Sequence, residues 1–367
     1  MTFPRKIYKK ILIIFFNFFN KRLTIQNNKK RNPNLKIKIF KVDKKKYKIY
    51  EIINGKIFTN SVDDTAYIIK NSLLQDPSYQ YRHSKNKNIK ENYVYRNGTP
   101  KIIKKFNGNI LSIVSGGAGK HNYGHWLLDV LSRILIFKKV YSLNIIDFVY
   151  VPNYKLKFQK ETLALLGIKK SKIIDSEEYK YIKGHKIYAT DHPISHDFNK
   201  ISPFIAREIK DNLFKKININ HNNEKIYKKI FIERDYSKFN LEGDLKKYRD
   251  ERILINSDEI AFFLKKKGFQ IIQLKNMTFA TQSNLFNRAE IVIGMFGAEM
   301  TNLLFCKPKT KIIEIKNRSH SLPDFVNISK ACKLKHIQIK LKPIYPTNIM
   351  QNGIILCPLS KIKKFLY

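Results

Sequence analysis

Cysteine is scarce in this chain, which has three cysteines in 367 residues, at positions 306, 332 and 357. An odd number of widely spaced cysteines builds neither a disulfide framework nor a Cys-x-x-Cys metal site. The scarcity therefore excludes small disulfide-stapled secreted domains, and it predicts a protein of a reducing cytoplasm. Cys306 ends an apolar stretch, which favours a core residue over a nucleophile.

Acidic residues are also few, because 29 Asp and Glu stand against 71 Lys and Arg, a net charge of +42. Such an excess favours polyanionic partners, including nucleic acid, anionic lipid and phosphorylated substrates. The lysines are dispersed along the chain, and no zinc-finger, RNP or helix-turn-helix pattern accompanies them. We therefore do not expect nucleic-acid binding to be the main function.

Long apolar runs are absent as well. The run 11–19 is shorter than the ~20 residues that cross a bilayer. Basic residues flank it on both sides, and no small-residue cleavage site follows, which argues against a secretory signal. A basic, aromatic-rich helix of this kind lies in the interface of an anionic membrane. The alternative is a first helix docked on the protein's own surface.

Length and patterning predict an α/β fold in two domains. The 367 residues suffice for two domains of roughly 150 residues each. Strand and helix patterns alternate along the chain, most regularly in its second half, which predicts parallel sheets covered by helices. We divide the chain into an amino-terminal segment, 1–30, a domain at 31–200 and a domain at 201–367. A helix that starts at Pro203 is expected to link the two domains.

A glycine-rich turn leads into a helix with one polar stripe. The turn at 116–119 follows a predicted strand at 111–114, and glycines let a ligand approach the main chain. His125 and Asp129 are four residues apart and share a helix face, which Arg133 extends by four more. An α/β enzyme builds a cleft from such a strand, turn and helix. The alternative is an ordinary ion pair on a solvated helix face.

A second strand, glycine turn and helix are predicted at 291–308. Gly294 and Gly297 form the turn, and backbone N–H groups at the start of the helix, near Ala298, can face an anion. Glu314 is expected at the carboxyl end of the next strand, where an acidic group can bind ribose hydroxyls. The alternative is a plain βαβ crossover without a ligand.

Three sequence blocks occur in order between about residues 110 and 320. They are the helix with the polar stripe at 122–133, a strand followed by an arginine at 231–235, and the second glycine turn at 294–308 with the strand residues 312–314 after it. Together they resemble glycosyltransferase family 61, which includes bacterial capsular-polysaccharide transferases and eukaryotic protein O-linked GlcNAc and plant xylan-decorating transferases. The resemblance implies a GT-B-like fold, with two Rossmann-like domains that face a central cleft. It also implies a nucleotide-sugar donor and inversion at the anomeric carbon. The domain at 31–200 is then the acceptor side, and the domain at 201–367 binds the nucleotide sugar.

Inverting transfer needs a base for the acceptor hydroxyl and positive groups for the leaving diphosphate. Asp129 is the first candidate for the base, and His125 is the alternative. Whichever of the two is the base, the other is expected to orient it. Arg234 is the candidate pyrophosphate clamp, because a guanidinium fork matches phosphate geometry. The alternative for Arg234 is a salt bridge to Asp235 or Glu233. We expect further donor contacts from Gly294, Gly297, Ala298 and Glu314, and further substrate contacts from Lys120, Asn122, Tyr123, Arg133 and Asn302.

A metal and other cofactors are not expected. The Asp-x-Asp motif with which fold type A transferases hold Mn²⁺ does not occur in the sequence. Its nearest match, residues 233–235, has an arginine between two acids, and that arginine would repel a cation.

The sequence departs from the family pattern at two positions of the second glycine turn. The family usually has a histidine where Phe296 stands and a small residue where Glu299 stands. A phenyl ring donates no hydrogen bond to a phosphate, and a carboxylate there opposes a pyrophosphate. Two alternatives follow from this departure and from the charge, namely a non-catalytic family member and a polyanion-binding protein with nucleic acid as its ligand.

The resemblance and the composition together predict an enzyme. We expect it to move a hexosyl or pentosyl group from a nucleotide sugar, a UDP-sugar, to a glycan acceptor in cell-surface or capsular polysaccharide biosynthesis. The acceptor is expected to be lipid-linked. We expect a cytoplasmic location, peripheral on the inner face of the cell membrane, through segment 1–30.

Overall fold

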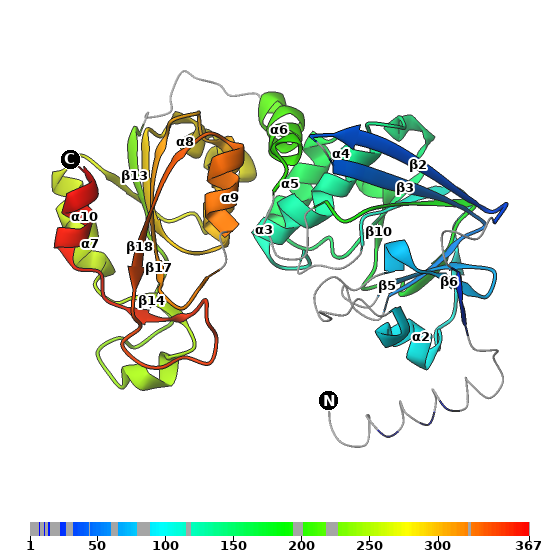
Figure 1. Cartoon of the computed structure of the whole chain (residues 1–367), viewed down its shortest axis with the longest axis horizontal. Coiled ribbons are helices and arrows are strands. Elements are labelled where there is room, and N and C mark those ends of the chain that lie inside the picture. Colours follow the sequence, from blue (N-terminus) through cyan, green and yellow to red (C-terminus); the bar gives the residue numbers. More distant parts are fainter. Residues whose placement is uncertain are drawn as a thin grey trace. The chain divides into compact units, whose positions relative to one another are not determined.

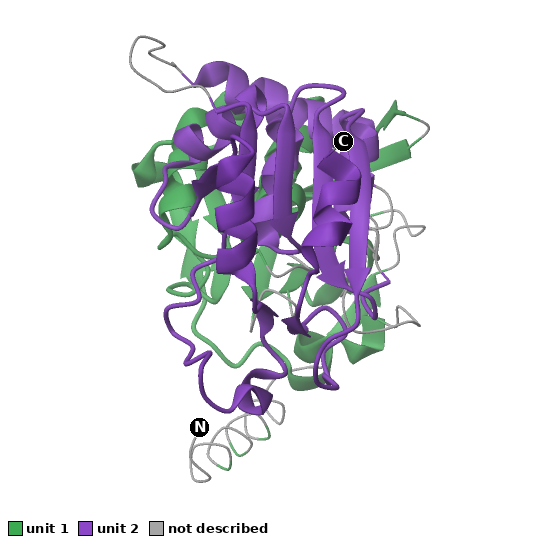
Figure 2. Ribbon diagram, turned by 90° about the vertical axis from the view of Figure 1, so that its left-hand side faces the viewer, with its two compact units in different colours: residues 1–196 green, residues 197–367 purple. Residues whose placement is uncertain are grey.

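The computed structural model of the chain divides into two compact units, residues 1–196 and 197–367, which Figure 2 colours separately. Segment 1–30 and the first glycine turn at 116–119 lie largely outside the residues that the structure describes. The described residues are 7, 11, 14, 23–26, 32–43, 45–59, 65–78, 89–114, 119–193, 201–217, 227–321 and 324–366.

Unit 1 contains a six-stranded sheet with a parallel centre. Its order is β10 (Ile173–Asp175), β9 (Phe148–Val151), β8 (Asn109–Ser112), β12 (Lys186–Thr190), β3 (Lys45–Ile53) and β2 (Leu35–Val42). The first four strands are parallel, whereas β3 runs antiparallel to β12 and β2 antiparallel to β3. The basic strand β2 thus lies at the edge of this sheet.

A second sheet covers one face of the first. It runs in the order β1 (Thr24–Gln26), β6 (Ser72–Leu74), β5 (Thr65–Ile69), β4 (Lys56–Thr59), β11 (Tyr181–Lys183) and β7 (Lys104–Lys105). Ile187 and Ala189 of β12 lie in one apolar cluster with Ile57 of β4, whereas Tyr188 between them contacts Phe137 on the opposite face. Because side chains of a strand alternate between faces, unit 1 has three layers, two sheets and a helical layer.

The helical layer contains the segment expected to carry the polar stripe. It consists of α3 (Tyr123–His125), a π-helical stretch η3 (Trp126–Leu131), α4 (Ser132–Phe137) and α5 (Lys157–Leu165), as Figure 1 shows for α3, α4 and α5. The predicted helix is thus confirmed, but its centre is π rather than α. Ser132 Oγ donates to the carbonyl of Leu127, five residues back, at 2.9 Å, and so supports the wider turn. π-Turns are rare and often occur at functional sites.

Unit 2 contains a five-stranded sheet in which all strands are parallel. Its order is β15 (Gln270–Ile272), β13 (Lys229–Ile232), β16 (Ile291–Met295), β17 (Lys311–Asn317) and β18 (Lys335–Leu341). Helices α7 (Ser257–Lys266) and α10 (Leu359–Leu366) pack on one face, and α8 (Phe279–Arg288) and α9 (Asp324–Ala331) on the other (Figure 1). The predicted α6 (Pro203–Asn212) begins at Pro203 with Ser202 as its cap, as expected.

Smaller elements complete both units. Two short strands, β14 (Arg252–Leu254) and β19 (Gly353–Ile355), pair in parallel in unit 2. The remaining helical segments are η1 (Asp76–Ser78), η2 (Ile89–Glu91), α2 (Tyr93–Asn97), η4 (Leu143–Ile145), η5 (Lys170–Lys172), η6 (Phe214–Lys216), η8 (Leu245–Tyr248) and η9 (Ala298–Phe305). None of the residues that the structure describes forms a helix with the length and apolarity that crossing a bilayer requires.

Each unit has a reversal of strand order, and this is where a crevice is expected in an open α/β sheet. In unit 2 the chain first places β15 beside β13 and then continues on the other side of β13 with β16. In unit 1 it places β9 and β10 on one side of β8, and β12 on the other. In unit 2 the helices that follow β13 and β16, α7 and η9, lie on opposite faces of the sheet. In open α/β sheets, ligands bind outside the carboxyl ends of the two strands at such a reversal. The α/β fold is thus confirmed, whereas the GT-B arrangement of two domains stays a prediction.

The core of unit 1 depends on Trp126, whose side chain is fully buried and whose Nε1 donates to Thr162 Oγ1 at 2.9 Å. We expect Trp126→Ala to lower the free energy of unfolding by about 3–5 kcal/mol, because the cavity adds to the lost burial. Urea denaturation followed by circular dichroism measures this change. Phe262→Ala is the control, because Phe262 is 63% exposed and its loss should cost less than about 0.5 kcal/mol. Equal effects of the two substitutions would contradict the central place of Trp126.

Candidate active site

A buried carboxylate and an imidazole meet at the crevice of unit 1. Asp129 lies in η3 with a side chain 2% exposed, and its Oδ2 is 2.5 Å from His125 Nδ1. The side chain of His125 is 12% exposed, so that the imidazole is the more accessible of the two groups. Asn122 caps α3 by accepting a hydrogen bond from the backbone N–H of His125 at 3.1 Å. This cap fixes the backbone on which the imidazole sits.

A second imidazole, which the sequence analysis missed, flanks the same carboxylate. His192 Nε2 lies 3.8 Å from Asp129 Oδ1, and the His192 side chain is 7% exposed. His192 follows the carboxyl end of β12 by two residues, beside the strand β8 that leads into the glycine turn. A polar Asp-His pair directly after a parallel strand was the signal that could have identified it.

The two imidazoles keep Asp129 ionised. Burial raises the pKa of Asp129, but the hydrogen bond from His125 and the charges of His192, His125 and Arg133 outweigh it, so that the pKa lies below its usual value. A buried carboxylate costs free energy unless it is paired. Asp129 is therefore an anion held between two histidines.

Arg133 anchors the helix rather than facing a substrate. Its side chain is 1% exposed, and Nη1 donates to the backbone carbonyls of Thr190, at 3.0 Å, and Asp191, at 3.4 Å. Arg133 thus ties α4 to the end of β12, next to His192. The expectation that it binds an acceptor is not supported by this placement, because a buried guanidinium cannot reach solvent.

The residues before His125 are held by neighbours within unit 1. Lys120 Nζ pairs with Glu177 Oε1, and its carbonyl accepts a hydrogen bond from Gln159 at 2.9 Å. The ring of Tyr123 packs edge-on against Phe158 of α5, and burial raises the pKa of its hydroxyl well above the usual value. The structure thus brings Asn122, Tyr123, His125 and Asp129 together around one short helix.

In unit 2, Arg234 and the second glycine turn meet at the crevice between β13 and β16. Arg234 follows β13, and its Nη1 lies 3.5 Å from the carbonyl of Phe296 and 3.9 Å from Glu299 Oε2. A Cβ atom at Gly297 would lie 2.6 Å from Arg234 Nη1. Glycine at this position therefore lets the guanidinium approach the main chain. The predicted helix from Ala298 is η9, a 3-10 helix, and the salt bridge of Arg234 goes to Glu299.

Phe296 sits in a group of cations that the sequence analysis missed. The centroid of its ring is 4.3 Å from that of His320, 5.4 Å from Lys316 Nζ and 5.6 Å from Arg252 Cζ. Burial and the neighbouring charge of Arg234 lower the pKa of Arg252. Two guanidiniums close enough to repel each other form a place for an anion. Arg252 lies on the short strand β14, and no sequence motif around it indicates a binding residue.

Three predicted donor or substrate residues have structural partners instead. Glu314 lies in the middle of β17 and not at its carboxyl end, because that strand continues to Asn317. It is fully buried and bonds His336 at 3.0 Å and Gln338 at 2.7 Å, which keeps it from a ribose. Asn302 is also fully buried and donates to Gln282 of α8 at 3.0 Å. A Cβ at Gly294 would lie 3.1 Å from Met300 Sδ, so that this glycine serves packing.

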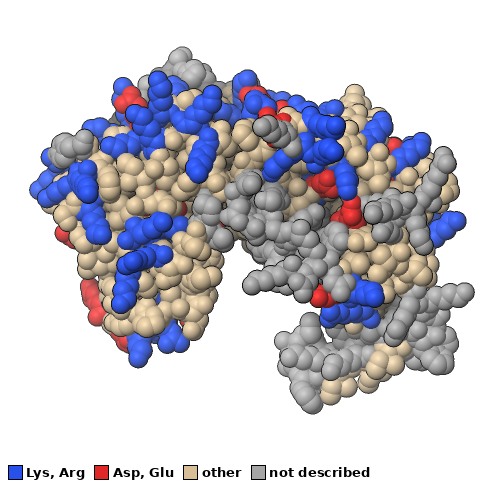
Figure 3. Space-filling view, viewed as in Figure 1, with Lys and Arg blue, Asp and Glu red and all other residues tan. Residues whose placement is uncertain are grey.

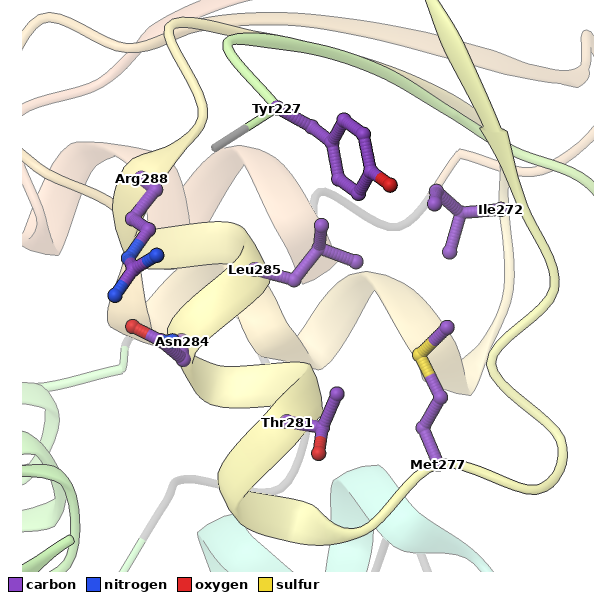
Figure 4. A pocket seen from close by; sticks show the side chains of 7 residues that line it. All are labelled: Tyr227, Ile272, Met277, Thr281, Asn284, Leu285 and Arg288. Atoms are coloured by element: carbon purple, nitrogen blue, oxygen red, sulfur yellow. The ribbon is translucent and has the colours of Figure 1, made fainter. Parts of the chain in front are cut away.

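A pocket elsewhere in unit 2 has a mainly apolar lining. It lies along α8, and Figure 4 shows Leu285 at its centre with Tyr227, Ile272 and Met277 around it. Thr281, Asn284 and Arg288 of α8 complete the lining. None of these residues belongs to the predicted site. Within the described ranges, no three His, Cys, Asp or Glu side chains are grouped so that they could hold a metal ion.

Comparison with known families identifies the family of the chain. Residues 123–313 match the sequence profile of the family Glycosyltransferase 61, a stretch that covers just over half of the chain. It begins at Tyr123, beside His125 and Asp129, and includes Arg234, Arg252 and the second glycine turn. Among curated proteins, none matches the chain.

The lowered pKa of Asp129 makes a prediction about stability. The pKa of Asp129 is lower in the folded protein than in the unfolded chain. Ionised Asp129 therefore stabilises the folded protein at pH values above its unfolded pKa, and this stability is lost as the pH falls through its folded pKa. We expect Asp129→Asn to destabilise unit 1 by about 1–3 kcal/mol near neutral pH and by less near pH 3, as measured by urea denaturation. Asp258→Asn, on an exposed helix start, is the control. A cost for Asp129→Asn that is the same at both pH values would contradict the assignment.

Proposed function

The chain belongs to glycosyltransferase family 61 and is a glycosyltransferase, and from this premise we propose that it moves a sugar from a UDP-sugar to a glycan acceptor of the cell surface. The glycan is a polysaccharide of the capsular type, and the acceptor is lipid-linked. The reaction inverts the anomeric carbon and needs no metal ion. The observation that carries this proposal is the pair of Arg234 and Arg252 at the crevice of unit 2.

Donor binding follows from the charges in that crevice. The guanidinium of Arg234 lies against the backbone of the glycine turn, and Arg252 and Lys316 lie around the ring of Phe296. Arg234 and Arg252, at the carboxyl end of a parallel sheet, match the diphosphate of a nucleotide sugar, and the buried Lys316 adds positive charge behind them. The same cations stabilise the charge that develops on the leaving diphosphate, the task that a metal performs in other transferases.

Glu299 does not exclude this role. It lies 3.9 Å from Arg234 Nη1, so that the guanidinium offsets its charge. Phe296 replaces a hydrogen-bond donor by a ring on which two cations and His320 pack. The phosphate contacts that a histidine at position 296 would make are assigned here to Arg234 and Arg252.

We assign the base to His125 and the orienting role to Asp129. Asp129 is the more buried of the two, and its Oδ2 holds Nδ1 of the imidazole. This contact leaves Nε2 as the ring nitrogen that takes the proton, and the carboxylate fixes the orientation of the ring. The acceptor hydroxyl loses its proton to Nε2, its oxygen bonds to the anomeric carbon, and the bond from that carbon to the diphosphate oxygen breaks with its electron pair on the diphosphate.

The assignment divides the substrates between the two units. Unit 1 carries the base and therefore binds the acceptor, and unit 2 binds the donor, as a GT-B arrangement requires. The enzyme works in the cytoplasm, on the inner face of the cell membrane, where lipid-linked acceptors and nucleotide sugars are both accessible. Segment 1–30 supplies membrane contact.

Nucleotide binding tests the donor site. We expect UDP to raise the midpoint of thermal unfolding without metal, with EDTA present, and more than GDP or CMP does. Arg234→Ala and Arg252→Ala should each weaken UDP binding about tenfold or more, because each removes a charge-assisted hydrogen bond. Arg249→Ala, a neighbouring exposed arginine, is the matched control. No response to any nucleotide would favour a non-catalytic or polyanion-binding protein, and a response only with Mg²⁺ would contradict metal independence.

Kinetics test the base. We expect His125→Ala to lower kcat for transfer about 10²–10⁴-fold with little change in KM for the donor, because unit 2 binds the donor and His125 lies in unit 1. Asp129→Asn should lower kcat as well and shift the pH profile. His185→Ala, an exposed histidine of the same unit, should leave kcat unchanged. Full activity of His125→Ala together with loss of activity in Asp129→Asn would instead make Asp129 the base.

A further inference from the structure

The amino-terminal edge of the sheet in unit 2 is lined by exposed lysines, whereas its carboxyl edge carries both acids and cations. Acidic residues follow the carboxyl ends of strands, as Glu233 and Asp235 do after β13 and Glu299 after β16. At the amino ends, exposed lysines stand before or at the start of the strands. In Figure 3, Lys and Arg gather along the upper rim of unit 2, and most of its visible acidic side chains lie lower. We call this surface the lysine rim, which consists of Lys228, Lys229, Lys265, Lys266, Lys307, Lys309, Lys333 and Lys335.

The lysine rim is a fixed surface rather than a set of loose loops. The backbone N–H of Lys309 donates to the carbonyl of Lys333 at 2.8 Å, and that of Lys335 donates to the carbonyl of Thr310 at 3.0 Å. Lys309 and Lys333 have left-handed backbones, with φ of 70° and 58°. Glycine or asparagine is the usual residue in such turns. Lysine therefore occupies two turn positions where its side chain is a conformational disadvantage.

Few acids neutralise the rim. Glu290 pairs with Lys228 at 2.8 Å. No acidic side chain among the described residues lies within ion-pair distance of Lys307, Lys309, Lys333 or Lys335. Helices α7 and α10 follow the parallel strands β14 and β19 and run side by side (Figure 1). The last turn of α10 therefore places Lys363 and Lys364 beside Lys265 and Lys266 in the last turn of α7.

Apolar groups accompany the charges. Phe262 on α7 is 63% exposed, and Lys266 Nζ lies 4.1 Å from the centroid of its ring. The apolar pocket of Figure 4 reaches the same edge, since Tyr227 precedes Lys228 and Arg288 ends α8 there. Nucleic-acid binding depends mainly on phosphate contacts and does not require an aliphatic pocket, whereas a lipid surface offers both phosphates and hydrocarbon.

We propose that the lysine rim of unit 2 docks on a membrane surface of anionic phospholipid. Its ammonium groups lie on the phosphates, and Phe262 enters the interface between headgroups and acyl chains. The carboxyl edge of the sheet, with Arg234 and the glycine turn, then faces away from the bilayer toward the aqueous nucleotide sugar. This surface is separate from segment 1–30 and does not depend on the transfer reaction.

Two charge-matched variants test the proposal. One carries Lys307→Gln, Lys309→Gln, Lys333→Gln and Lys335→Gln on the rim. The other carries Lys238→Gln, Lys246→Gln, Lys247→Gln and Lys342→Gln near the carboxyl edge, where the same number of exposed lysines is removed. Co-sedimentation of the full chain is measured with phosphatidylcholine vesicles, with and without phosphatidylglycerol. Both variants keep segment 1–30, so that its contribution cancels in the comparison.

We expect the rim variant to bind phosphatidylglycerol vesicles at least about tenfold more weakly than the parent, with a smaller salt dependence. The control variant should bind these vesicles nearly as the parent does. Phe262→Ala should weaken binding without changing the salt dependence. Equal losses in the two variants would show a general effect of net charge and overturn the proposal. Loss of oligonucleotide binding in the rim variant, with vesicle binding retained, would overturn it in favour of a nucleic acid. Circular dichroism and the midpoint of thermal unfolding confirm that each variant is folded.

Discussion

The direction of parallel strands is the constraint on which both candidate sites depend. All carboxyl ends of a parallel sheet lie on one edge, and the chain leaves a crevice only where its strand order reverses. In unit 1 that reversal lies between β8 and β12, which brings His192 next to His125 and Asp129. In unit 2 it lies between β13 and β16, which brings Arg234 to the glycine turn. Residues distant in sequence thus meet because of strand order alone.

Buried charge determines how each site is built. Asp129 is an anion whose burial is offset by two histidines and an arginine. Arg234 and Arg252, in contrast, are cations that repel each other and have the acids Glu299 and Glu251 near them. In the first site the negative charge of Asp129 is offset by its own neighbours, and such a site suits proton transfer. The second has excess positive charge and suits a polyanionic ligand. This difference, more than any motif, supports the division of labour proposed for the two units.

The sequence predicted what short-range patterns determine. The start of α6 at Pro203 and the strand β13 were confirmed, because caps and apolar spacing are local. The π-helical stretch after His125 was missed, since its wider turn depends on packing around Trp126 and on Ser132. Propensity alone does not distinguish it from an α-helix.

Site residues were predictable only where they belong to a local motif. His125, Asp129 and Arg234 have such motifs, whereas His192 and Arg252 come from other strands and depend on sheet order. Glu314 was placed wrongly because the predicted strand ended too early. Its partners His336 and Gln338 lie on β18, and long-range pairing of this kind leaves no local trace.

The cations around Phe296 have a consequence for turnover under the proposed mechanism. They contact the diphosphate, which is the part of the donor that stays whole when the sugar leaves. The nucleoside diphosphate therefore keeps the contacts that held the donor and gains negative charge on its freed oxygen. Strong attraction then slows departure of the spent nucleotide, so that product release is a slow step of the proposed cycle. Competition by free nucleoside diphosphate follows from the same geometry.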